Sequence, residues 1–122
     1  MRLGEFLAED ANSKLARHYT QTLNSKFAPY NIPIKITTHF IDRMGDSRNQ
    51  EPITVSEVAD FFSKLLIKRK KFLQDLRDGT SVLIVDLETD ITVPFKKIQD
   101  TLIATTIMRG TMRQGSQQKV AI

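Results

Sequence analysis

The sequence predicts a single α+β domain in which an N-terminal helix and a long central helix pack on a small, mainly antiparallel sheet. Apolar residues recur at helical spacing in two long stretches, one before residue 28 and one after residue 53. The C-terminal half instead carries three stretches in which apolar and polar residues alternate, joined by short links. The order of helix, strand, helices and antiparallel strands is typical of α+β proteins, and 122 residues suit one domain.

The first predicted helix begins at Asp10 or Asn12, either of which can cap it, and runs to about Lys26. Its apolar side chains are Leu15, Tyr19, Leu23 and Phe27. Residues 1–9 form either a first turn of this helix or a leader that precedes the domain at 10–122. A turn with two prolines follows, and the alternation at Ile34–Thr37 predicts a half-buried strand.

Two further helices are predicted after this strand. The first runs from His39 to Met44, with Thr38 as its cap and Gly45 as its stop, and a polar loop follows it. The second covers Thr54–Arg77, because Thr54-Val55-Ser56-Glu57 is a capping box in front of a long amphipathic stretch. We expect a bend in this helix near residue 70.

Three strands are predicted at Ser81–Leu87, Asp90–Phe95 and Thr101–Met108. Pro94 places the second strand at a sheet edge or at a strand end, because proline has no N–H to donate. The remaining chain predicts a loose tail with a short last strand at Val120–Ile122. The sheet face toward the helices should carry Ile36, Leu83, Val85, Val93 and Ile103 or their immediate neighbours.

The composition narrows the function classes. The chain contains no cysteine, which excludes disulfides, thiol nucleophiles and cysteine-ligated zinc. It shows no cluster typical of a metal site and no glycine-rich phosphate loop, so we expect no metal and no cofactor. No apolar run is long enough to span a membrane. The net charge of +4, concentrated in Lys64–Lys71 and near the C-terminus, predicts either an anionic partner or a solvated helix face.

His39 and Arg43 are the leading candidates for chemistry. Residues four apart lie on the same face of a helix, so an imidazole and a guanidinium would point to the same place. The imidazole can move a proton near neutral pH, and the guanidinium can hold a phosphate. In the alternative interpretation, His39 bonds a neighbouring backbone group and Arg43 pairs with Asp42, Asp46 or Glu57.

The stretch Thr-His-Phe-Ile-Asp-Arg at 38–43, with Arg48 and the helix that follows, resembles the RegB family of phage endoribonucleases. The resemblance covers about residues 30–110 and implies the general fold of the RelE toxins. It further implies metal-independent cleavage of RNA, in which a 2′-hydroxyl attacks the adjacent phosphate and leaves a 2′,3′-cyclic phosphate. His39 would be the catalytic histidine, with Arg43 and Arg109 holding phosphate charge. The RNA would also contact Lys35, Arg48, Lys64 and Lys68.

The sequence departs from the RegB family at one position. Ser63 stands where the family has a second functional histidine, and serine cannot transfer a proton in its place at neutral pH. Either another group has taken that role, or the chain binds RNA with little or no cleavage. A non-catalytic protein of host takeover, which binds RNA or a host protein, is therefore the alternative function.

The first nine residues resemble the leader peptides of proteins packaged inside tailed-phage capsids. Leu7-Ala8-Glu9 is similar to the site that the prohead protease cuts. Both resemblances imply a phage protein in the cytoplasm of an infected bacterium, and the second implies packaging in the virion. An amphipathic first helical turn explains the same residues equally well.

Overall fold

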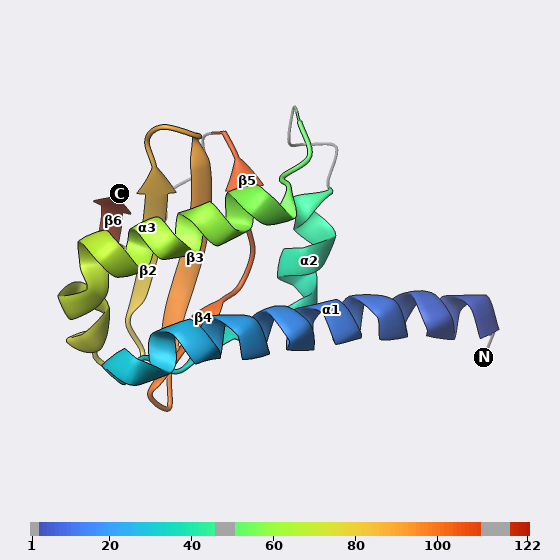
Figure 1. The fold of residues 1–122 in the computed structure, drawn as a ribbon, viewed down its shortest axis with the longest axis horizontal. Helices are drawn as coiled ribbons and strands as arrows, with labels where there is room; N and C mark the ends of the chain where they lie inside the picture. The colour runs from blue at the N-terminus through green and yellow to red at the C-terminus, as the bar shows by residue number, and fades with distance from the viewer. Residues whose placement is uncertain (1–2, 46–50, 111–117) are drawn as a thin grey trace.

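The computed structural model describes residues 3–45, 51–110 and 118–122, with side chains from residue 11 onward. Within these ranges the helices α1 (Leu3–Phe27), α2 (Thr38–Met44) and α3 (Val55–Gln74) accompany one six-stranded sheet. Helix α3 crosses one face of the sheet, and α1 runs along its lower edge and extends beyond it (Figure 1). The predicted α+β class, with helices packed on a sheet, is confirmed.

The starts of α1 and α2 differ from the predicted ones. Helix α1 begins at Leu3, earlier than the predicted caps, and is followed by a 3-10 turn at Ala28–Tyr30. The cap of α2 is Thr37 and not Thr38, because the Thr37 hydroxyl accepts a hydrogen bond from the N–H of Phe40 at 3.1 Å. The strand before it therefore ends one residue earlier than predicted.

The predicted capping box of α3 is confirmed. The Thr54 hydroxyl accepts from the N–H of Glu57, and the Glu57 carboxylate accepts from the N–H of Thr54. The expected bend is present at Arg69, whose φ of −131° and ψ of 24° are not helical. The helix ends at Gln74, three residues before the predicted end at Arg77.

The sheet has the strand order β1-β4-β3-β2-β6, and β5 pairs with β3 beyond the end of β4. Its central pairs are antiparallel, as predicted, but both outer pairs, β1 with β4 and β2 with β6, are parallel. The last strand, predicted at Val120–Ile122, is β6 at Gln118–Ala121. Residues 111–117 of the predicted tail lie outside the described residues. The other strands are β1 (Ile34–Ile36), β2 (Ser81–Asp86), β3 (Ile91–Ile98), β4 (Thr101–Ala104) and β5 (Met108–Arg109).

The predicted strand Thr101–Met108 is divided into β4 and β5, and the division explains Pro94. Phe95 of β3 faces Ala104, and Thr92 faces Met108, so the β4–β5 segment contains one extra residue, as in a bulge. Pro94 lies inside the central strand β3, so its predicted place at an edge or strand end is wrong. Its carbonyl accepts from the N–H of Thr105, and its missing N–H therefore faces the interrupted stretch.

Phe62 of α3 lies at the centre of the core and is 1% exposed. Its ring lies 5.6–6.3 Å from four other phenylalanine rings, which come from α1, α2, α3 and β3. The predicted Ile36 and Val93 belong to the same core. In β2 and β4 the immediate neighbours of the named residues take this role: Val82, Ile84, Leu102 and Ala104.

The outer edge of β1 is closed by side chains of α1 instead of a further strand. The amide of Asn24 donates to the carbonyl of Ile34 and accepts from its N–H, both at 2.8 Å. One turn earlier, the Thr20 hydroxyl accepts from the N–H of Ile36 at 2.9 Å. Backbone groups of successive strand residues point to opposite sides. Those of residues 34 and 36 therefore point toward α1, whereas the carbonyl of Pro33 and the N–H of Thr37 bond to β4. Helix α1 thereby fixes the strand that leads into α2.

We expect Phe62→Ala to lower the free energy of unfolding by about 3–5 kcal/mol, because it leaves a cavity among four aromatic rings. Urea denaturation measures this loss. Ile67→Ala is the matched control, since Ile67 lies on the same helix and is 82% exposed. Equal effects of the two substitutions would contradict the central place of Phe62.

Candidate functional site

His39 and Arg43 form a hydrogen-bonded pair on α2. Arg43 Nε donates to His39 Nε2 at 3.3 Å, so the predicted arrangement of the two side chains is present. Phe40 and Met44 turn inward to the core, which leaves His39 exposed and Arg43 half-buried. The pair therefore combines a titratable imidazole and a guanidinium at one place on the surface.

In this hydrogen bond the guanidinium is the donor and His39 Nε2 is the acceptor, because a guanidinium can only donate. Among the alternative partners predicted for Arg43, Asp42 accepts from the amide of Asn12 at 2.6 Å. Glu57 is bound by Arg109, and Asp46 lies outside the described residues.

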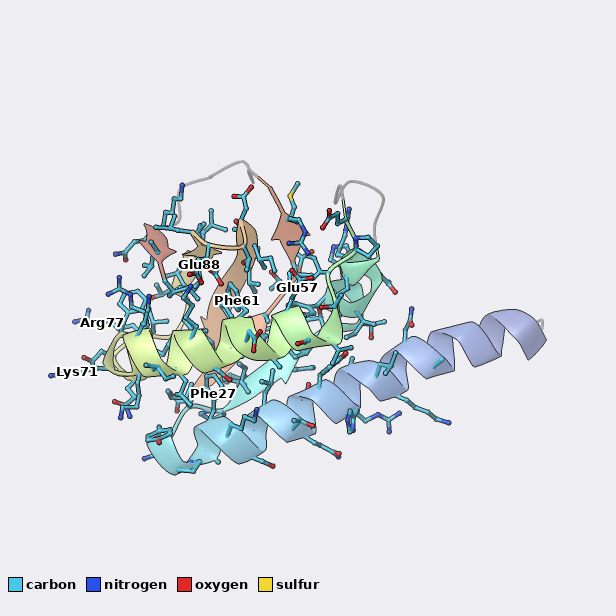
Figure 2. All side chains as sticks on the ribbon, turned by 45° about the horizontal axis from the view of Figure 1, so that its top comes forward. Phe27, Glu57, Phe61, Lys71, Arg77 and Glu88 are labelled. Atoms are coloured by element: carbon cyan, nitrogen blue, oxygen red, sulfur yellow. The ribbon has the colours of Figure 1, made fainter. Side chains whose placement is uncertain are left out.

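Arg109, predicted to hold phosphate charge, is bound to protein groups at the start of α3. Its Nη2 donates to both carboxylate oxygens of Glu57 at 2.7 Å. Nη2 also lies 3.4 Å from the carbonyl of Pro52, and Nε and Nη1 donate to the carbonyls of Glu51 and Thr89 at 3.4 and 3.3 Å. These contacts tie β5 to the first turn of α3, and Figure 2 shows Glu57 at that end of the helix.

Lys64, predicted to contact RNA, is also bound to carboxylates. Its ammonium lies 2.9 Å from Asp86 and 3.2 Å from Glu88. The hydrogen bond to Asp86 raises the pKa of Lys64. Burial by itself would raise the pKa of Asp86, but the hydrogen bonds from Lys64 and from the N–H of Glu88 outweigh it and lower this pKa. Lys64 thus anchors α3 to the end of β2.

Further basic residues follow Lys64 on α3, and their side chains lie in different environments. Lys68 and Lys71 are exposed, whereas Arg69 donates to the carbonyl of Ala121 in β6 at 2.9 Å. The ammonium of Lys70 lies over the ring of Tyr30, 4.5 Å from its centre. Figure 2 shows Lys71 at the end of α3 opposite Glu57. Of the two predicted RNA contacts on α3, Lys68 is the exposed one.

Lys35 and Ser63, two further residues of the sequence analysis, are both exposed. Lys35 is exposed on β1 between the buried Ile34 and Ile36. Arg48 lies outside the described residues. Ser63 is exposed on α3. The structure thus brings together His39 and Arg43 and gives Lys64 and Arg109 acidic partners that the sequence analysis did not identify.

Among the described side chains, no group of three or more His, Cys, Asp or Glu residues could hold a metal ion. None of the helices in the described ranges is long and apolar enough to cross a membrane. Comparison with protein families, curated proteins and solved structures found no match for this chain.

The ion pair of Arg109 and Glu57 predicts acid-sensitive stability. The hydrogen bond from Arg109, with that from the N–H of Thr54, lowers the pKa of Glu57 below its ordinary value of 4.5. A lowered pKa stabilises the folded state above that value, and this stability is lost as the pH falls below it. We therefore expect the free energy of unfolding to decrease once the pH drops below about 4.5.

Urea denaturation between pH 7 and pH 3 checks this expectation. Glu57→Gln should cost about 1 kcal/mol at pH 7, through the lost cap and ion pair, and should make the acid-dependent decline shallower. A residual decline is expected, because Asp86 contributes with the same sign. Glu51→Gln is the control, since its side chain is exposed and only its carbonyl meets Arg109. An unchanged decline in Glu57→Gln would contradict the assignment.

Proposed function

We propose that this protein is a metal-independent endoribonuclease that acts on single-stranded RNA in the cytoplasm of an infected bacterium. The observation that carries the proposal is the surface pair of His39 and Arg43, joined at 3.3 Å. The resemblance of residues 30–110 to the RegB family and the net charge of +4 support it. The proposed reaction breaks the bond to the 5′-oxygen and leaves a 2′,3′-cyclic phosphate.

The geometry of the pair suggests how the reaction proceeds. When a phosphate binds, the Arg43 guanidinium turns from the imidazole to the phosphate oxygens, which it can hold in two places. His39 Nε2 then has a free lone pair and accepts the proton of the 2′-hydroxyl as that oxygen attacks phosphorus. Arg43 stabilises the additional negative charge of the pentavalent phosphorus. The 5′-oxygen leaves with a proton delivered by water.

The second candidate function is RNA binding without cleavage. It is favoured by two positions on which efficient catalysis would depend: Ser63 stands in place of a histidine, and Arg109 is bound to Glu57. The exposed cations Lys35 and Lys68 would still contact phosphates. A protein of this kind would retain salt-sensitive affinity for RNA, whereas a protein directed at a host protein would show none.

We expect purified protein to cut RNA in excess chelator and to leave 2′,3′-cyclic ends. His39→Ala should slow cleavage by about 10²–10⁴-fold, the range for one acid–base group. His18→Ala is the matched control, because His18 is the second histidine of the chain and is exposed on α1. Incubation with phage and host transcripts, followed by end analysis of the fragments, measures both rates.

Three outcomes have distinct meanings. Cuts that persist in His39→Ala would assign the activity to a contaminant or to another residue. Absence of cuts, together with RNA binding that weakens steeply with salt, would favour the second candidate. Absence of both cuts and binding would contradict both functions.

A further inference from the structure

We propose that a pocket between α1, β1 and the start of α2 binds one nucleotide of the RNA strand, with its phosphate on Arg17 and Lys35. This inference rests on the proposed function for the nature of the ligand. The pocket has a volume of about 390 Å³, within the roughly 300–1,000 Å³ of typical ligand sites. It is lined by Ser13, Ala16, Arg17, Thr20, Lys35, Ile36, Thr37 and Thr38.

The charge of the lining favours a phosphate. Arg17 and Lys35 are both exposed, and neither has an ion-pair partner among the described residues. Among the described side chains that line the pocket, none is acidic. Lys64 and Arg109, in contrast, each lie against carboxylates. Two unpaired cations at one concave site can provide charge-assisted hydrogen bonds to the same anion.

The walls of the pocket are fixed by contacts that do not involve the ligand. Thr20 bonds the backbone of Ile36, and the Thr37 hydroxyl donates to the carbonyl of Thr105 at 2.9 Å. The buried Ala16 and Ile36 contribute apolar surface against which a ribose or a base can lie. A pocket with fixed walls, apolar surface and cations at its rim suits a nucleotide better than a free inorganic ion.

The position of the pocket connects it to the His39–Arg43 pair. Thr37 and Thr38 line it, and His39 follows in the same turn of α2. Asp42, one turn beyond Thr38, is held by the amide of Asn12. A nucleotide in the pocket would therefore lie beside the proposed cleavage point and would position the strand on His39.

Titration of the full chain with adenosine 5′-monophosphate, followed by amide chemical shifts, tests the pocket directly. We expect the amides of Ser13, Thr20, Thr37 and Thr38 to shift. Arg17→Gln and Lys35→Gln should each weaken binding about tenfold, since each removes a charged phosphate contact. Lys26→Gln is the matched control, because it removes the same charge from an exposed position of α1 outside the pocket.

A second titration uses a short single-stranded RNA with 2′-O-methyl groups, which cannot be cut. The slope of log affinity against log salt should become shallower by about 0.7 in each pocket variant and stay unchanged in Lys26→Gln. Equal changes in all three variants would indicate diffuse attraction and overturn the inference. Nucleotide binding without RNA binding would overturn the assignment to an RNA strand.

The same measurements separate this inference from the proposed function. If the protein cuts RNA through His39 but the pocket amides do not move with either ligand, the pocket assignment alone fails. If no cutting occurs but both ligands bind at the pocket and require Arg17 and Lys35, the endoribonuclease proposal fails and the pocket assignment holds.

Discussion

The positions of Lys35, His39 and Arg43 depend on how α1 closes the edge of β1. A strand with a partner on only one side leaves backbone donors and acceptors unpaired, and such an edge invites pairing with other chains. Here the amide of Asn24 supplies one donor and one acceptor in the geometry of a neighbouring peptide, and Thr20 serves the next free N–H. Because β1 runs directly into α2, this closure also fixes where His39 lies.

Three carboxylates determine which cations are free to contact a partner molecule. Glu57 holds Arg109 to the start of α3, and Asp86 with Glu88 holds Lys64 to the end of β2. These pairs connect the central helix to the sheet at both places. The cations left exposed include Lys35 and Arg17 beside the start of α2 and Lys68 on α3. The proposed RNA surface is therefore centred on α1, β1 and α2 and not on the middle of α3.

Local signals in the sequence were sufficient for the start of α3 and for the His39–Arg43 pair. The capping box at Thr54 and the four-residue spacing of the pair act within one helical turn, so their geometry follows from the helix itself. The short links between the central strands also predicted their antiparallel pairing, which the sheet shows for β2 with β3 and for β3 with β4.

Contacts between distant segments could not be read in this way. Arg109 and Glu57 are 52 positions apart, and nothing in either local sequence indicates the other. The parallel pairing of β1 with β4 and of β2 with β6 depends on the whole topology. Asn24 looks like an ordinary exposed helix residue until β1 lies beside it. The pocket was missed for the same reason, since Arg17 and Lys35 come from different elements.

Hydrogen exchange at the N–H of Ile34 tests the closure of β1 most directly. We expect this amide to be protected in the wild-type protein and to exchange about 10–100-fold faster in Asn24→Ala, while Val93 in the central strand keeps its protection. Gln21→Ala, at an exposed position of α1 one turn before Asn24, should change neither amide. An Ile34 amide that exchanges freely in the wild type, or that is insensitive to Asn24→Ala, would contradict the account.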